Sequence, residues 1–185
     1  MNIVIVSGTS RENRKSHFVA EYLQKTLFSM KHEVKLVDVK HYNLPLLDYK
    51  FDLHPNPSKK LIELQVIIDK ADACIFVTPE YNGGPAGALK NTLDYFRKEY
   101  KNKVIGISTV SDGAMGGMRA ATTMQLQALY YEGFPIPRVL NVANVSRIFS
   151  TDGELLDDNF KEKTAHFLND FLWLAEAVEL KKQNK

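Results

Sequence analysis

The run ACIFVT at Ala73–Thr78 is almost uniformly apolar. Strands have this composition when helices cover both faces of a parallel sheet, so the run predicts a central, fully buried strand. Two prolines, Pro135 and Pro137, interrupt the start of the last strand-like segment of the chain. The other segments with β-rich character are Asn2–Val6, Glu33–Val39, Lys103–Val110 and part of Gly133–Val142.

Each predicted strand is followed by a segment whose apolar residues have helical spacing. Ser16 and Ser58 are the expected N-caps of two of these helices. Tyr130 and Tyr131 follow the apolar spacing of a third helix, and both side chains are expected to pack inside the protein. The predicted helices are Ser16–Ser29, Ser58–Lys70, Ala88–Lys98, Met118–Glu132 and Asp157–Leu180.

Alternating strands and helices predict a parallel sheet with helices on both faces. Five such units predict a flavodoxin-like three-layer αβα sandwich with a five-stranded parallel sheet in the order 2-1-3-4-5. In this strand order a ligand binds where the carboxyl ends of strands one and three meet. The loops that follow Val6 and Thr78 are therefore expected to carry the chemistry.

The overall composition is that of one globular domain spanning residues 1–185, with 44% apolar and 25% charged residues. A net charge of +2 with scattered cations argues against a nucleic-acid partner. The single cysteine, Cys74, excludes an internal disulfide and is expected to be a packing residue. No apolar run approaches the ~20 residues that span a bilayer, and no signal peptide is evident, so we expect a cytoplasmic protein.

The segment GTSRENRKS at Gly8–Ser16 has the character of an anion-binding loop. It leads into a helix N-terminus, where free N–H groups and the helix dipole favour a phosphate. Hydroxyl groups and the guanidinium of Arg11 could supply further hydrogen bonds. The loop lacks the glycine patterns of nucleotide-triphosphate P-loops and of dinucleotide-binding folds. A polar loop that binds nothing remains an alternative for this segment taken alone.

The segment TPEYNGGPAGALKNTLDY at Thr78–Tyr95 resembles the NADPH-dependent FMN reductase family, which includes quinone, azo-dye and chromate reductases. The similar residues are Pro79–Asn82, Leu89–Asn91 and Asp94-Tyr95. Gly8, Thr9 and Arg11 are similar to the family's first loop, and Gly113, Gly116, Gly117 and Arg119-Ala120 to its third. This resemblance covers about residues 2–133.

The resemblance implies non-covalently bound FMN, with NADPH or NADH as co-substrate. It implies that the first loop contacts the phosphate, the second lines the isoalloxazine ring, and the third approaches the ring from another side. His17 begins the helix beneath the phosphate. The candidate FMN-binding residues are Thr9, Ser10, Arg11, Ser16, His17, Phe18, Pro79, Glu80, Tyr81, Asn82, Gly83, Ser111, Gly113 and Gly116.

The expected function is therefore hydride transfer from NAD(P)H through FMN to a small-molecule acceptor such as a flavin, a quinone or an azo dye. No protein acid or base is needed for the hydride step, so no catalytic residue is assigned, and no histidine or carboxylate spacing predicts a metal site. The resemblance also implies a homodimer or homotetramer. The alternative is a flavodoxin-like electron carrier without efficient NAD(P)H oxidation, against which the net charge of +2 counts.

Overall fold

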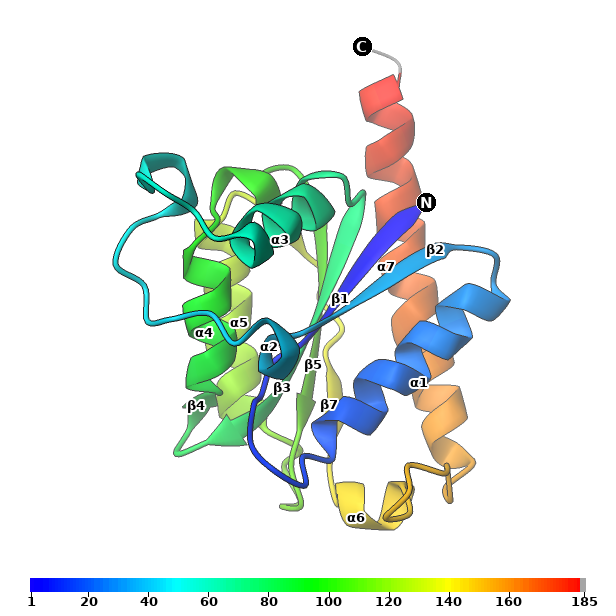
Figure 1. The fold of residues 1–185 in the computed structure, drawn as a ribbon. Helices are drawn as coiled ribbons and strands as arrows, with labels where there is room; N and C mark the ends of the chain where they lie inside the picture. The colour runs from blue at the N-terminus through cyan, green and yellow to red at the C-terminus, as the bar shows by residue number, and fades with distance from the viewer. Residues whose placement is uncertain (184–185) are drawn as a thin grey trace.

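The apolar run that begins at Ala73 forms the middle strand of the sheet in the computed structural model, which describes residues 1–183 (Figure 1). The parallel path through the sheet has the order β2-β1-β3-β5-β6, with β4 paired to β3 and β7 paired to β5. The strands are β1 (Asn2–Ser7), β2 (Glu33–Asp38), β3 (Ala73–Tyr81), β4 (Gly84–Pro85), β5 (Val104–Val110), β6 (Phe134–Pro135) and β7 (Leu140–Val142).

The flavodoxin-like order predicted from the sequence is confirmed, because β5 is the fourth predicted strand and β6 with β7 is the fifth. The sheet has seven strands rather than five for two reasons. The fifth strand is divided: β6 pairs with the start of β5 and β7 with its end, and prolines, which lack an N–H for the ladder, lie at the break. The third strand continues beyond Thr78 to Tyr81 and folds back as β4.

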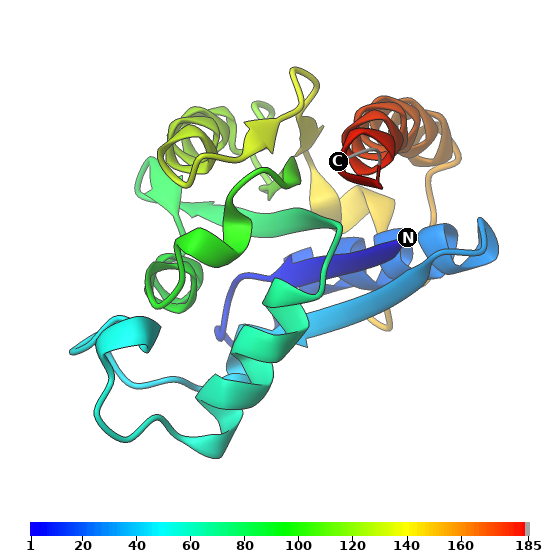
Figure 2. The ribbon, with the colours of Figure 1, turned by 90° about the horizontal axis from the view of Figure 1, so that it is seen from above.

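The helices form two layers, one on each face of the sheet (Figures 1 and 2). Helices α1, α6 and α7 pack on one face, and α3, α4 and α5 pack on the other. The helices are α1 (Ser16–Ser29), α2 (Val39–Tyr42), α3 (Lys59–Asp69), α4 (Gly87–Asp94), α5 (Met118–Tyr130), α6 (Val145–Ile148) and α7 (Asn159–Gln183), with 3₁₀ turns at Phe51–Leu53 and Lys98–Tyr100.

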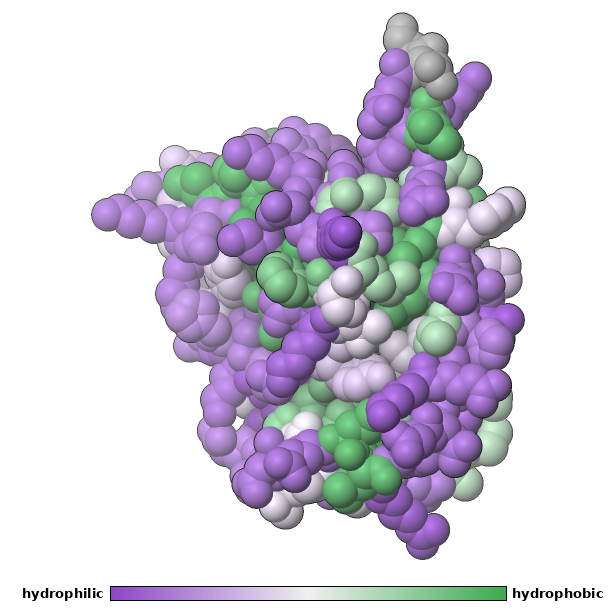
Figure 3. Space-filling model, turned by 90° about the vertical axis from the view of Figure 1, so that its right-hand side faces the viewer, coloured by the Kyte–Doolittle hydropathy of each residue, from purple (hydrophilic) through white to green (hydrophobic). Residues whose placement is uncertain are grey.

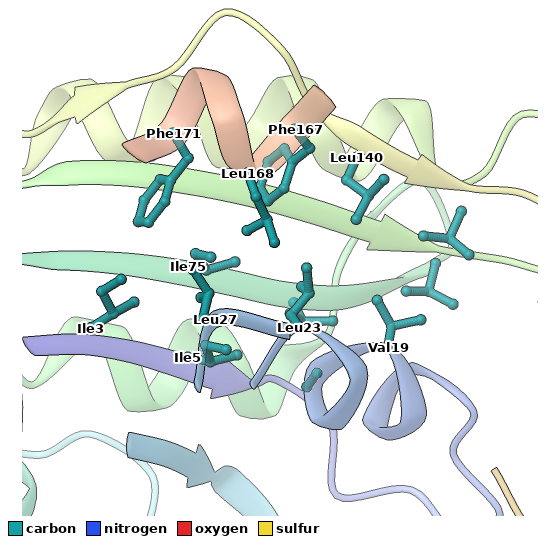
Figure 4. Packing of buried hydrophobic residues seen from close by; sticks show 14 of the residues in the cluster. Ile3, Ile5, Val19, Leu23, Leu27, Ile75, Leu140, Phe167, Leu168 and Phe171 are labelled. Atoms are coloured by element: carbon teal, nitrogen blue, oxygen red, sulfur yellow. The ribbon is translucent and has the colours of Figure 1, made fainter. Parts of the chain in front are cut away.

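The side chains of β3 alternate between these two cores. Ile75 packs with Leu23 of α1 and Phe167 of α7 on one face (Figure 4). Cys74 and Phe76 belong to the core on the opposite face. Cys74 is confirmed as a packing residue, and burial raises the pKa of its thiol to about 11. The middle strand is therefore covered on both sides, as its composition predicted.

The helix ends agree with the sequence in one case and differ in another. Ser58 is confirmed as the N-cap of α3, because its side chain accepts a hydrogen bond from the N–H of Leu61. Ser16 is not a cap: α1 begins at this residue, Lys15 occupies the N-cap position, and no side chain caps the helix. Tyr131 packs in the core as expected, whereas Tyr130 is exposed.

Figure 3 shows the side of the molecule where α1 and α7 lie; polar residues predominate there, and apolar residues gather in smaller patches. The carboxyl-terminal turns of α7 project beyond the rest of the molecule in this view and in Figure 1. Among the described residues 1–183, no helix combines the length and the apolar character that crossing a membrane requires.

Candidate functional site

A cavity of about 350 Å³ opens at the carboxyl ends of β1, β3 and β5. This is the edge of the sheet where the strand order predicts a ligand. All three predicted loops contribute to its wall, together with the start of α6. The lining residues are Arg11, Asn13, Arg14, Lys15, Ser16, Pro79, Glu80, Tyr81, Val110, Ser111, Asp112 and Val145.

The first loop begins with a close approach to the middle strand. The N–H of Gly8 donates to the carbonyl of Val77 at 2.8 Å. A Cβ atom at Gly8 would lie 2.7 Å from that carbonyl oxygen and 2.9 Å from the Cβ of Leu89, so only glycine fits here. The loop is thereby held against β3 at its first residue, before it turns outward around the cavity.

The end of the first loop meets the cavity at the N-terminus of α1. Ser16 is one of the residues that line this region, and its Oγ atom is buried and has no hydrogen-bond partner within residues 1–183. No side chain caps α1, so the N–H groups at its start are available to an anion, apart from that of Phe18, which donates to the carbonyl of Lys15 at 3.1 Å. A buried, unpartnered hydroxyl beside an uncapped helix start is the arrangement that a phosphate group would satisfy.

The second loop is a β-hairpin rather than an irregular loop. Tyr81 pairs with Gly84, and Asn82 and Gly83 form the two-residue turn between them with φ values of +51° and +82°. Positive φ at both positions is characteristic of a type I′ turn, and Asn-Gly is its preferred sequence. The residues from Pro79 to Tyr81 therefore enter the cavity wall as an extension of the central strand.

Tyr81 connects the hairpin to the first loop. Its hydroxyl lies 2.9 Å from the Oγ1 of Thr9, which also accepts a hydrogen bond from the N–H of Arg11 at 3.3 Å. The guanidinium carbon of Arg11 lies 5.8 Å from the centroid of the Tyr81 ring, within the range of a cation–π interaction. The first two loops thus contact each other directly at one side of the cavity.

Glu80 connects the hairpin to the third loop. One of its carboxylate oxygens accepts hydrogen bonds from the N–H groups of Arg119 and Ala120, at 3.0 and 3.2 Å, in the first turn of α5. The other lies 3.8 Å from the guanidinium of Arg119. A carboxylate at a helix N-terminus interacts favourably with the helix dipole. Glu80 therefore sets the position of the hairpin relative to α5.

The third loop and α6 complete the wall with a small polar network. The Oγ of Ser111 accepts a hydrogen bond from the N–H of Gly113 at 3.0 Å. Asp112 accepts hydrogen bonds from the N–H of Ser146, at 2.8 Å, and from its hydroxyl. These two bonds lower the pKa of Asp112, which therefore carries its charge at neutral pH. Lys15 of the first loop also contacts the Ser146 hydroxyl.

The structure brings some of the predicted site residues to the cavity and places others behind it. Arg11, Ser16, Pro79, Glu80, Tyr81 and Ser111 line it. Ser10 is exposed, Thr9 is buried against Tyr81, and Asn82 and Gly83 form the hairpin turn. Gly113 and Gly116 shape the third loop without lining the cavity.

His17 and Phe18 lie on the far side of the first helical turn. His17 places Nδ1 3.0 Å from the Oγ of Ser7 and Nε2 3.5 Å from Glu21. The Phe18 ring packs against Phe149, with 6.2 Å between the ring centroids. The assignment of these residues to FMN stays a prediction.

Several lining residues were not singled out from the sequence: Asn13, Arg14, Lys15, Val110, Asp112 and Val145. Arg14 and Lys15 carried a usable indication, because cations that directly precede a helix start favour an anion site. Asp112 and Val145 carried none, since only the fold brings α6 to the third loop. Within residues 1–183 no group of three or more histidine, cysteine or acidic side chains could hold a metal ion.

The sequence pattern of the NADPH-dependent FMN reductase family matches residues 1–146 of this chain, a range that includes all three loops. The chain belongs to this family. The family predicted from the sequence is thereby confirmed, together with the FMN cofactor and the NAD(P)H dependence that define it. The site fits the cofactor, because the uncapped start of α1 and the unpartnered Ser16 hydroxyl offer what its phosphate needs.

Individual proteins of known sequence or structure are similar to this chain. An NADPH azoreductase from Bacillus sp. (strain OY1-2) is 30% identical over 161 residues, covering 85% of this chain and 84% of the relative. A quinone reductase from Pseudomonas putida is 28% identical over 178 residues, covering 92% and 90%. The flavoenzyme NAD(P)H:acceptor oxidoreductase FerB from Paracoccus denitrificans shares the fold, with a TM-score of 0.79, 22% identity and coverage of 96% and 98%.

Proposed function

We propose that this single-domain chain binds FMN in the three-loop cavity and uses it to transfer hydride from NADPH or NADH to a small-molecule acceptor. The observation that carries the proposal is the buried, unpartnered hydroxyl of Ser16 beside the uncapped start of α1. It lies at the end of a cavity whose other walls are the hairpin and the third loop. FMN supplies the redox chemistry when it is bound, and the protein supplies binding, orientation and charge.

Each loop has a separate task in this proposal. The first loop binds the phosphate through Ser16, the N–H groups of α1 and nearby cations. The hairpin residues Pro79–Tyr81 present a fixed edge of backbone to the ring, because they continue the central strand. Ser111 and Asp112 of the third loop also bound the cavity. Their role is to fix the geometry in which donor and acceptor approach within ~3–3.5 Å of each other.

The acceptors that suit such a site are flat conjugated molecules such as quinones, free flavins and azo dyes. The test is to purify the protein, measure flavin absorbance and FMN uptake, and mix the loaded protein anaerobically with NADPH or NADH before adding an acceptor panel. A colourless protein that takes up no FMN would contradict the proposal. Bound FMN that neither nucleotide bleaches would instead indicate an electron carrier.

We also propose a cytoplasmic homodimer or homotetramer. A cytoplasmic location would give the enzyme access to NAD(P)H. Support for the oligomer comes from α5, where Leu126, Leu129 and Tyr130 are 65%, 58% and 66% exposed. Apolar side chains grouped in this way favour a protein interface. Sedimentation velocity is expected to give an oligomer that Leu129→Glu dissociates, and a monomeric parent at micromolar concentration would contradict the proposal.

A further inference from the structure

Arg14 has more contacts than any other cation in the cavity wall. Its Nη1 donates to the carbonyl of Thr9 at 2.5 Å and to Oδ1 of Asp38 at 2.6 Å, and its Nη2 donates to Oδ2 of Asp38 at 2.5 Å. The arginine and aspartate side chains are only 12% and 22% exposed. This bidentate geometry is the strongest form of an arginine–carboxylate ion pair. Arg14 is thus fixed at the cavity, whereas the side chain of Arg11 is exposed and lies over the Tyr81 ring.

Asp38 is the centre of this arrangement. It is the last residue of β2 and the N-cap of α2, and its Oδ1 also accepts the N–H of Lys40 at 2.9 Å. Burial raises the pKa of Asp38, but the hydrogen bonds and charge of Arg14 outweigh burial and lower it overall. The carboxylate therefore stays charged and links the first loop to the end of an adjacent strand.

The contacts leave part of Arg14 available to a ligand. They use three of the five N–H groups of its guanidinium, and the residue lines the cavity two positions before Ser16. The bond to the Thr9 carbonyl closes the first loop on itself, which limits the conformations open to residues 9–16. A loop held in its binding conformation loses less entropy when the ligand binds.

We propose that Asp38 is a positioning residue for the phosphate of FMN: it holds Arg14, and through Arg14 it holds the first loop in the conformation that aims the Ser16 hydroxyl and the start of α1 into the cavity. Asp38 does not touch the phosphate itself. This inference rests on the FMN site proposed above. It predicts that a carboxylate near the phosphate strengthens binding, although simple charge repulsion predicts the opposite.

A neighbouring ion pair provides a matched control. Glu12 pairs with Lys40 at 2.7 Å and also joins the first loop to α2, but its side chain is 81% exposed. Glu12→Gln and Asp38→Asn each remove one negative charge from the same region. If charge alone mattered, both variants would bind FMN more tightly. If Asp38 positions Arg14, only Asp38→Asn weakens binding.

The test measures FMN and riboflavin dissociation constants by flavin fluorescence for the parent, Asp38→Asn, Arg14→Lys and Glu12→Gln. Riboflavin lacks the phosphate, so we expect Asp38→Asn and Arg14→Lys to weaken FMN binding at least tenfold and to change riboflavin binding less than twofold. Glu12→Gln is expected to change neither more than twofold. Arg14→Lys keeps the charge without the bidentate contact, so parent-like FMN binding by this variant would overturn the proposal.

Hydrogen exchange of the flavin-free proteins tests, without a ligand, whether Asp38 holds the first loop in place. Amides of residues 9–16 are expected to exchange at least tenfold faster in Asp38→Asn, while those of residues 111–117 exchange as in the parent. Unchanged exchange in the first loop, equal loss of riboflavin affinity, or FMN binding as tight as the parent's would each overturn the proposal. A parent that binds no FMN would contradict the proposed function, and the exchange rates would still decide whether Asp38 holds the loop.

Discussion

We expect the substitution Ser16→Ala to stabilise the flavin-free protein and to weaken its binding of FMN. In the flavin-free protein, the change removes a buried polar atom that has no partner within residues 1–183. Leaving such a group unsatisfied costs about 1–3 kcal/mol, and we take the lower end of this range, about 1 kcal/mol. For a chain of 185 residues, this corresponds to a rise of about 2–4 °C in the Tm of the flavin-free variant.

In the FMN complex, the same change removes a hydrogen bond to a charged phosphate. Such bonds contribute about 1.5–3 kcal/mol, so FMN binding is expected to weaken by a factor of about 10 to 150. Riboflavin affinity is expected to stay close to that of the parent, because riboflavin carries no phosphate. Calorimetric titration of both flavins, with thermal unfolding of the flavin-free proteins, measures the two effects separately.

Thr164 of α7 provides the control. Its Oγ1 is also buried and unpartnered within the described residues, but it lies in the core and does not line the cavity. Thr164→Val should raise the Tm as Ser16→Ala does and leave FMN binding unchanged. If Ser16→Ala lowered the Tm of the flavin-free protein and left the FMN affinity intact, the assignment of this hydroxyl to the phosphate would be refuted.

Three further predictions concern the framework. Gly106→Ala would place a Cβ 2.9 Å from the Phe167 ring, so we expect urea unfolding to show a loss of about 1–3 kcal/mol in the free energy of unfolding. Gly87→Ala is the control and should cost less, because a Cβ there meets nothing within 4 Å. Equal losses in the two variants would contradict the prediction. Burial lowers the pKa of Lys103 below 10.5, so the unfolded chain binds more protons and the free energy of unfolding should rise with pH between the lowered pKa and 10.5. Unfolding at several pH values should show that Lys103→Met removes this rise. The same pH dependence in the parent and the variant would refute the prediction. Glu80→Gln should lower the free energy of unfolding by about 1 kcal/mol because α5 loses the charge at its N-terminus, and a parent-like denaturation midpoint would argue against that role.

The strand order could be predicted because it depends on local patterns that the chain repeats. The apolar run from Ala73 predicted a strand buried on both faces, and the regular alternation with helical segments predicted the rest of the parallel sheet. The division of the fifth strand was also visible, since Pro135 and Pro137 lie within it. The continuation of β3 to Tyr81 was not predicted, because the Gly/Pro-rich sequence was interpreted as the start of a loop.

The site was predictable where one segment supplies both the backbone and the chemistry. Ser16 was expected at the cavity because it stands at the helix start after the first loop, and the residues from Pro79 were expected there from the resemblance to the FMN reductase family. The partner of Arg14 was not, because Asp38 is 24 residues away and only the pairing of β1 with β2 brings it near. Tyr130 and Tyr131 show the same limit, since the placement of α5 decides which of two adjacent tyrosines faces the core.

The continuation of β3 into the cavity wall has a consequence for how the enzyme could be re-engineered. Side chains along a strand alternate in direction, so one residue inserted between Thr78 and Tyr81 would reverse the facing of every hairpin residue beyond it. It would also break the Glu80 contacts with α5. Residues 114 and 115 of the third loop are exposed and carry no such register. Libraries aimed at new acceptors should therefore vary the length of the third loop and keep that of the hairpin constant.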